Sequence, residues 1–298
     1  MIILGDLYNK SLSDSIGREL SCDVSYPEIT VFADTEQRVR LDSDKIKGEK
    51  VGVVLSLSEN ADSSVLRFAF TIDAIVRSGA DHITGIIPYI PYSRADHEFR
   101  PGEASPLSLV IKLLEDSGVN EFIILDPHSI KIPELFSKKV HALAATDLFG
   151  EKIRQLSKEV TLVSPDMGGV RRIEALIDYL DGNVNKLIIN KERDYESGSL
   201  SISETKGKIA GDCFIIDDII STGGTILKAV EYLTNNGAKN IYVFATHGIF
   251  AGDALAKLAA TKISKIYVTD SVPVKATNPK LEVLSAASLL AERIKIDD

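Results

Sequence analysis

One stretch of the chain, CFIIDDIISTGGTI at Cys213–Ile226, limits what the sequence can fold into more than any other. Its apolar beginning leads into two adjacent acids, Asp217 and Asp218, and two further apolar residues precede the small polar loop Ser221–Thr225. Apolar residues at helical spacing follow at once. The stretch therefore predicts a buried strand, an acidic turn, a glycine-rich loop and the N-terminus of a helix.

The loop has the chemistry of an anion site. Backbone N–H groups of a glycine-rich loop can surround an anion, and the dipole of the following helix favours negative charge at the same point. Beside Gly223 and Gly224, the hydroxyls of Ser221, Thr222 and Thr225 add donors. The two carboxylates before the loop repel a phosphate and instead suit hydroxyl groups, from which they accept hydrogen bonds. A phosphate beside a diol indicates a sugar phosphate as the ligand.

Strand and helix patterns alternate along the whole chain, which is typical of a parallel sheet covered by helices. A length of 298 residues favours two domains, and we expect them at 1–143 and 144–298, with the last helix a candidate to pack on the first. Residues 51–84 and 213–243 both run strand, polar loop, helix, Gly-Ala, strand. This indicates a duplicated unit of which only the second copy keeps the phosphate loop. Convergence is the alternative, because such units recur in every α/β fold.

The composition narrows the class of partner. A net charge of −9 gives no general basic surface for nucleic acid. No apolar run reaches the length of a membrane span, and the N-terminus turns polar too early for a signal peptide. Two cysteines without metal-site spacing fit a reducing cytoplasm. The motifs of P-loop kinases, dinucleotide dehydrogenases and G-x-S-x-G hydrolases are absent from the sequence.

Two stretches of the first half are candidates for chemistry. Ala33–Glu36 places acids at the bend of a predicted hairpin, for which a solvated acidic turn is the plain alternative. Residues 88–106 form a long irregular loop after a strand, and Arg94 in it is placed to clamp a phosphate. A mobile surface loop with ordinary charges is the alternative there.

Further polar residues follow predicted strands. His128 and Asp166 each occupy a turn after a strand and suit a shared magnesium ion, which usually takes one or two protein ligands. Lys191 and Arg193 follow the strand 186–189 and suit a transition state that spreads negative charge over phosphoryl oxygens. Taken singly, a structural histidine and a solvated basic pair are the ordinary explanations. Ligands bind at the carboxyl ends of strands in open α/β sheets, so together these residues predict one site for phosphates, metal and a sugar.

Several of these stretches also resemble known motifs. IIDDIISTGGTI resembles the phosphoribosyl pyrophosphate-binding motif of type I phosphoribosyltransferase-like proteins. FADTE, PYSRADHEF, LDPHS, VSPDMGGVRR and NKERD, in this order along the chain, resemble the ATP hairpin, flexible ATP loop, metal turn, V-x-P-D-x-G-G-x-x-R segment and basic catalytic loop of the ribose-phosphate pyrophosphokinases. The match runs over nearly the whole chain.

The resemblance implies an α/β protein of two tandem phosphoribosyltransferase-like domains, each a mainly parallel sheet flanked by helices. It implies transfer of the pyrophosphoryl group of ATP to the 1-hydroxyl of ribose 5-phosphate, with AMP as the other product and Mg²⁺ as cofactor. In this family the hairpin comes from a neighbouring subunit, which implies a homo-oligomer, at least a dimer, with a shared ATP site.

Carried over by position, the resemblance assigns ribose 5-phosphate to Arg193, Asp217, Asp218, Ser221, Thr222, Gly223, Gly224 and Thr225. It assigns ATP to Phe32, Asp34, Thr35, Glu36, Arg94, Ala95 and Asp96. The metal falls to His128 and Asp166, and stabilisation of the transferring group to Lys191 and Arg193.

Some positions depart from the better-known members: Thr35, Ala95, Pro127 and the pair Gly223-Gly224. With the short chain, they are more similar to archaeal members, so ADP inhibition, phosphate activation and a hexamer do not follow from the resemblance. Two other functions stay open. One is a phosphoribosyltransferase that consumes the sugar pyrophosphate, against which the duplicated half argues. The other is a regulatory paralogue without activity, in which loss of Lys191 or the acid pair would be expected.

Overall fold

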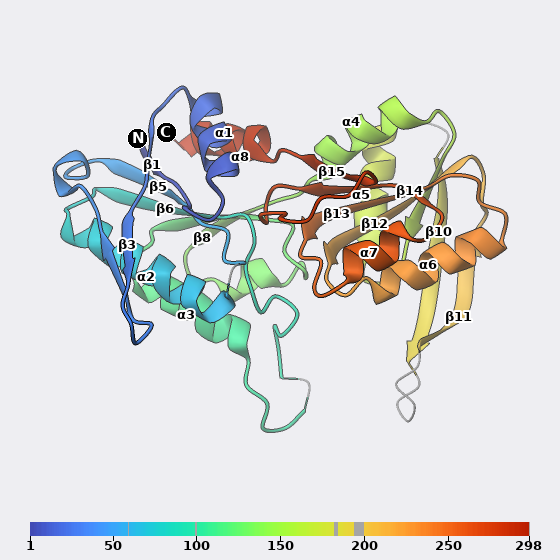
Figure 1. The fold of residues 1–298 in the computed structure, drawn as a ribbon, viewed down its shortest axis with the longest axis horizontal. Coiled ribbons are helices and arrows are strands. Elements are labelled where there is room, and N and C mark those ends of the chain that lie inside the picture. The colour runs from blue at the N-terminus through green and yellow to red at the C-terminus, as the bar shows by residue number, and fades with distance from the viewer. Residues whose placement is uncertain (59, 99, 182–183, 194–199, 298) are drawn as a thin grey trace. The chain divides into compact units, whose positions relative to one another are not determined.

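The computed structural model describes residues 1–58, 60–98, 100–181, 184–193 and 200–297. The chain forms two compact units, the first made of Met1–Leu143, Asp270–Pro273 and Ser285–Asp298 and the second of Ala144–Thr269 and Val274–Leu284. Each unit contains a mainly parallel sheet flanked by helices, which confirms the predicted α/β class (Figure 1).

The first unit has a six-stranded sheet in the order β2-β1-β5-β6-β7-β8, and every neighbouring pair in it is parallel. A separate antiparallel hairpin, β3-β4, precedes β5. The strands are β1 (Ile2–Leu4), β2 (Val24–Ser25), β3 (Glu28–Val31), β4 (Gln37–Arg40), β5 (Lys50–Val54), β6 (His82–Ile87), β7 (Glu121–Leu125) and β8 (Lys139–Leu143). The helices are α1 (Lys10–Leu20), α2 (Ala61–Arg77), α3 (Pro106–Asp116) and α8 (Ala287–Asp297), with 3-10 turns at Ser43–Lys45 and Ile132–Leu135.

Alternation along the strands divides the core of this unit into two layers. Phe122 and Ile124 of β7 pack in the same cluster as Phe68 of α2, whereas Ile123 packs with Leu290 of α8. Successive side chains of a strand point to opposite faces, so one apolar strand supplies both layers. Helices α2 and α3 therefore cover one face of the sheet, and α1 and α8 cover the other (Figure 1).

The second unit has a seven-stranded sheet in the order β11-β10-β9-β12-β13-β14-β15, parallel except for the pair β10-β11. The strands are β9 (Val160–Ser164), β10 (Val184–Arg193), β11 (Leu200–Gly207), β12 (Asp212–Ile220), β13 (Ile241–Gly248), β14 (Ile263–Thr269) and β15 (Leu281–Leu284). The helices are α4 (Thr146–Leu156), α5 (Val170–Leu180), α6 (Gly224–Asn235) and α7 (Ala254–Ala259).

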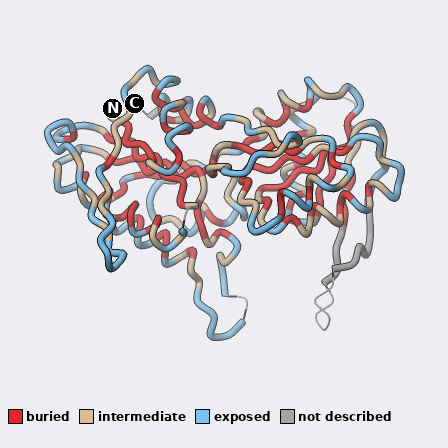
Figure 2. Tube along the Cα trace, viewed as in Figure 1, coloured by how far each residue is buried: buried red, intermediate tan, exposed pale blue. Residues whose placement is uncertain are grey.

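The same alternation organises the core of the second unit. Phe214 and Ile216 of β12 pack with Ile173 of α5, whereas Ile215 packs with Val230 of α6. Buried residues concentrate along the strands of this sheet and on the facing sides of its helices (Figure 2). The sheet thereby fixes the carboxyl ends of β9, β12 and β13 side by side, and the loops that follow these strands meet at one edge.

Two strands extend further than the sequence indicates. β12 continues through Asp217 and Asp218 to Ile220, so the acids stand in the strand and not in a turn. β10 continues past Ile189 to Arg193, because β11 pairs with it in antiparallel register. Local sequence underestimates both strands, since each is prolonged by pairing with another strand, β13 for β12 and β11 for β10.

None of the helices in the described part of the chain is long and apolar enough to cross a membrane.

Candidate functional site

The glycine-rich loop after β12 presents an open helix N-terminus. Gly223 stands at the N-cap of α6 with a φ of 77°, a conformation that favours glycine, and no side chain caps this end of the helix. A Cβ added to Gly224 would meet nothing within 4 Å. The backbone N–H of Ala251 donates to the carbonyl of Ser221 at 3.1 Å and ties the loop to the neighbouring β13–α7 connection. The N-terminus of α6 thus has no side-chain cap and has open space beside Gly224, as an anion site requires.

The acid pair lies directly before this loop. Asp217 and Asp218 are 8% and 3% exposed, so both carboxyls are largely removed from water although they are ionisable. An Nη2 of Arg172, in the first turn of α5, lies 3.4 Å from Oδ2 of Asp218. The backbone N–H of Asp218 donates to Oδ1 of Asp217 at 2.9 Å. Carboxylates held in this way keep a fixed orientation toward a ligand.

The electrostatics of the pair are unfavourable in the absence of a ligand. Burial raises the pKa of the Asp217 carboxyl well above its usual value, and the negative charges of Asp218 and Asp166 raise it further. The positive charge of Arg172 lowers this pKa. Hydroxyl groups of a ligand would stabilise the ionised form by donating hydrogen bonds to it.

Asp166 follows β9, the neighbour of β12 in the sheet, and so reaches the same edge. Its turn is fixed by two hydrogen bonds, from Oγ of Ser164 to its carbonyl at 2.7 Å and from the N–H of Gly169 to its Oδ1 at 3.1 Å. A Cβ on Gly169 would come within 2.6 Å of Oγ of Ser164, which explains the glycine. The structure therefore brings together Asp166, the acid pair and the loop, as expected from their positions at strand ends.

Arg172 was not among the site residues predicted from the sequence. Its signal is present in VSPDMGGVRR, because an arginine three residues after the helix-capping Gly169 lies in the first turn of α5. The sequence alone does not show that Arg172 pairs with Asp218, because β9 and β12 become neighbours only in the folded sheet.

Lys191 and Arg193 lie in the last part of β10, beyond Ile188, where the parallel pairing with β9 ends. Their backbone pairs with Ile202 and Leu200 of β11 after a register shift at Asn190. They are therefore on an extended ribbon. The sequence had predicted instead that they lie in a loop after the strand 186–189. Their side chains lie outside the part of the chain that the structure describes.

The predicted ATP residues of the hairpin lie at its tip in the first unit. Phe32, Asp34, Thr35 and Glu36 connect β3 to β4, with Thr35 at a φ of 74°. The N–H of Phe32 donates to the carbonyl of Glu36 at 2.8 Å, and the phenyl ring is 45% exposed beneath the guanidinium of Arg38. An exposed aromatic ring at a hairpin tip is available for stacking.

Three more expected residues of the loop after β6 lie in the first unit. Arg94 is exposed, the N–H of Ala95 donates to the carbonyl of Tyr92 at 2.8 Å, and Asp96 pairs with His97 at 2.7 Å. His128 is exposed in the turn after β7, two residues beyond Asp126, which has a φ of 39°.

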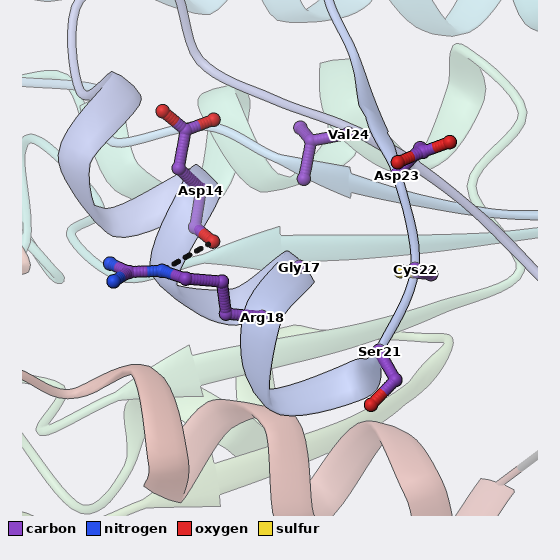
Figure 3. A pocket seen from close by; sticks show the side chains of 7 residues that line it. All are labelled: Asp14, Gly17, Arg18, Ser21, Cys22, Asp23 and Val24. Atoms are coloured by element: carbon purple, nitrogen blue, oxygen red, sulfur yellow. Dashed lines mark hydrogen bonds between the residues drawn. The ribbon is translucent and has the colours of Figure 1, made fainter.

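The first unit also has a surface pocket of about 360 Å³, which is lined by none of the predicted site residues (Figure 3). It is formed by the end of α1 and the segment before β2, including Asp14, Arg18 and Cys22. Nε of Arg18 donates to the carbonyl of Asp14 at 3.4 Å. Because these residues precede β2, the pocket is at the amino edge of the parallel sheet, opposite the edge at which such folds bind ligands. Among the described residues, no three His, Cys, Asp or Glu side chains form a ready-made metal cage.

Comparisons with known proteins agree over the full length. Residues 1–118 match the N-terminal domain of ribose phosphate pyrophosphokinase, and residues 176–296 match the phosphoribosyl synthetase-associated domain. The chain is 34% identical to the ribose-phosphate pyrophosphokinase of Aquifex aeolicus (98% of this chain, 94% of the relative) and 32% identical to that of Brucella melitensis (96% and 93%). The crystal structure of phosphoribosylpyrophosphate synthetase from Mycobacterium smegmatis has a TM-score of 0.91 at 32% identity, covering 99% of this chain and 98% of that chain.

Proposed function

Since this chain belongs to the ribose-phosphate pyrophosphokinase family, we propose that it transfers the pyrophosphoryl group of ATP to the 1-hydroxyl of ribose 5-phosphate. The products are 5-phosphoribosyl 1-pyrophosphate, a precursor for nucleotide biosynthesis, and AMP. The observation that carries the proposal is the open N-terminus of α6 directly beside the buried acid pair.

The second unit holds the acceptor in this proposal. The N–H groups at Gly223, Gly224 and Thr225, with the hydroxyls of Ser221 and Thr222, bind the 5-phosphate. Asp217 and Asp218 accept hydrogen bonds from the ribose hydroxyls, and Arg172 keeps Asp218 oriented. Holding both ends of the sugar fixes the 1-hydroxyl in one direction, which lowers the entropic part of the barrier.

Lys191 and Arg193 supply positive charge to the transferring group, and Arg193 also contacts ribose 5-phosphate. Pyrophosphoryl transfer requires little covalent work from the protein, so charge stabilisation and alignment supply most of the rate. Side-chain donors of this kind are typically worth about 10²–10³ in turnover.

Magnesium fits the residues present. Asp166 offers a carboxylate held by Gly169 and close enough to Asp217 to raise its pKa, and hard oxygen donors are those that Mg²⁺ prefers. Asp166 and His128 would hold it, the latter directly or through a water. Bound there, it would neutralise polyphosphate charge. One or two protein ligands suffice for this ion.

The ATP half of the site is proposed to consist of the hairpin tip, Phe32–Glu36, and Arg94–Asp96. Phe32 stacks on the base while Asp34 and Glu36 accept hydrogen bonds from it. We further propose that the hairpin serves a neighbouring subunit, so that a homo-oligomer, at least a dimer, shares the ATP site. The enzyme would work in the cytoplasm, where both substrates occur.

The proposal is tested by incubating the protein with Mg²⁺, ribose 5-phosphate and ATP labelled at its β-phosphorus. We expect AMP and labelled 5-phosphoribosyl 1-pyrophosphate in equal amounts. A phosphoribosyltransferase would instead leave ATP intact and consume 5-phosphoribosyl 1-pyrophosphate with a base. Absence of AMP from a folded preparation that binds both substrates would sink the synthetase proposal.

A further inference from the structure

Arg67 is buried in the middle of α2 and joins three segments that are remote in sequence. It is only 5% exposed, although arginine is almost never fully buried unless it is paired. Its guanidinium stands 4.2 Å from the centroid of the Tyr8 ring, and its charge acts on the carboxyl of Asp6. Its Nε donates to Oε1 of Gln37 at 3.0 Å. Residues of the β1–α1 connection and of the hairpin thus share one cation.

The hairpin needs an anchor of this kind. β3 and β4 form a two-stranded sheet of their own, and none of residues 28–40 is buried. A two-stranded hairpin is at best marginally stable in water by itself. In the part of the chain that the structure describes, its main contact with the rest of the first unit is between β4 and α2. Gln37 is the first residue of β4 and follows directly after the tip Phe32–Glu36, so its tie to Arg67 acts at the base of the tip.

The other partners of Arg67 fix it to the edge of the sheet. Oδ2 of Asp6 accepts the N–H of Ser56, two residues past β5, at 3.1 Å, and Oδ1 accepts the N–H of Tyr8 at 2.8 Å. Asn9 adds a hydrogen bond from Nδ2 to Oγ of Ser56 at 3.1 Å. Arg67 therefore interacts, on the side away from Gln37, with groups that follow the carboxyl ends of β1 and β5.

From this arrangement we infer that Arg67 is a positioning residue that orients the hairpin for ATP through Gln37. A planar guanidinium donates in fixed directions, so a guanidinium that packs on the Tyr8 ring and is attracted by the Asp6 carboxylate holds Gln37 in one place. Nucleotide contacts at the tip then form without a further cost of ordering the hairpin. The inference rests on the proposed function, in which the tip binds the base of ATP.

Gln37→Ala is the decisive variant, because it removes the tie and leaves Arg67 with Asp6. We expect the KM for ATP to rise about fivefold to tenfold, with the KM for ribose 5-phosphate and kcat nearly unchanged. Gln37→Glu keeps an acceptor at the same atom and should restore a KM for ATP close to that of the wild type. Arg40→Ala is the matched control and should have no effect, since Arg40 is in the same strand but pairs at 3.7 Å with Glu28, which also belongs to the hairpin.

Amide hydrogen exchange supplies a readout that does not depend on activity. In Gln37→Ala, the peptides covering 28–40 should exchange faster in the ligand-free protein, while those covering β6 stay protected. Unchanged exchange of the hairpin, or a loss that affects kcat and both KM values alike, overturns the inference. Faster exchange in a protein whose wild type makes no AMP would instead support the anchor and overturn the proposed function.

Discussion

The loop after β5 and the loop after β12 occupy the same place in two similar strand–loop–helix units, but their surroundings differ. In the first unit, the N–H of Ser56 donates to the carboxylate of Asp6, an anion that the chain itself supplies. In the second unit, Gly223 caps α6 and the space around Gly224 is open. In the first copy, a carboxylate of the chain itself thus accepts an N–H of the loop, whereas in the second copy α6 begins at a glycine loop with open space beside Gly224.

The difference shows how two similar units in one chain can have different roles. Burial raises the pKa of the Asp6 carboxyl, while hydrogen bonds from the N–H of Tyr8 and Ser56 and the charge of Arg67 lower it. Asp6 therefore accepts hydrogen bonds from the chain itself, while Arg67, whose charge acts on it, donates to Gln37 of the hairpin. In the second unit, Arg172 pairs with Asp218 of a buried acid pair that directly precedes the glycine-rich loop. In the proposed function, the first unit therefore supplies the hairpin, and the second binds the sugar phosphate.

The largest effect is expected at the basic ribbon of the second unit. Lys191→Ala should lower kcat by about 10²–10³, because it removes positive charge from the transferring group. Binding of ribose 5-phosphate, measured by calorimetry without ATP, should stay within a factor of a few. Lys186→Ala is the matched control from the same strand, since Lys186 pairs with Glu174 at 2.6 Å, and its turnover should be unchanged. Unchanged turnover of Lys191→Ala would remove this residue from the mechanism.

The internal anion of the first unit is tested by Asp6→Ala. This variant leaves the buried Arg67 without its carboxylate and the N–H of Ser56 without an acceptor, so the free energy of unfolding should fall by about 2 kcal/mol. Formate, which replaces the missing carboxylate, should raise the melting temperature of the variant more than that of the wild type. Asp14→Ala, at the surface of α1, serves as the control. Equal responses of wild type and variant to formate would show that the slot does not accept an anion.

The acceptor assignment predicts a smaller and selective loss. Asp217→Asn or Asp218→Asn removes a charged acceptor for the ribose hydroxyls and should weaken ribose 5-phosphate by about tenfold. ATP binding should change much less, because the proposed ATP residues lie in other stretches. Separate titrations of the two ligands decide between these outcomes. Equal weakening of both ligands would contradict the division between acceptor and donor halves.

The two loops also show what a sequence can reveal. The strand, loop and helix at Cys213–Ile226 were predictable because their signals are local: an apolar run, two glycines and helical spacing. The helices and the interior parallel strands followed from periodicity for the same reason, whereas the parallel edge strands β2, β8 and β15 were not predicted. The pairing of Arg172 with Asp218 was not predictable, because it depends on β9 and β12 being neighbours in the sheet.

The contacts of the first loop were equally hidden. Ser56 gives no sign in sequence that Asp6, 50 positions earlier, accepts its N–H. Gln37 likewise gives no sign that Arg67, 30 positions later, donates to it. The extension of β10 to Arg193 depends on a strand that follows it, β11, whose own sequence is too polar to suggest pairing. Pairing with other segments, and not local propensity, determined what was missed.

The smallest expected effect is a pH dependence that arises at Asp217, directly before the glycine-rich loop of the second unit. The folded-state pKa of Asp217 is raised above its unfolded value, so the folded protein retains a proton there that the unfolded chain has released. Its favourable contribution is complete below the unfolded pKa and is lost as pH rises through the folded pKa. Asp217→Asn removes this loss and should raise the melting temperature of the ligand-free protein on the order of 2 °C near neutral pH.

The same comparison at lower pH makes the prediction specific. The advantage of Asp217→Asn should shrink as pH falls, because the wild-type carboxyl is then protonated in both states. Glu174→Gln, an exposed acid in α5, controls for a general change in charge. Saturating ribose 5-phosphate should reverse the order of stability, since only the wild type gains from binding it tightly. A variant that is less stable than the wild type at every pH without ligand would show that the ionised pair is stabilising, and that the second loop is closed by its own groups like the first.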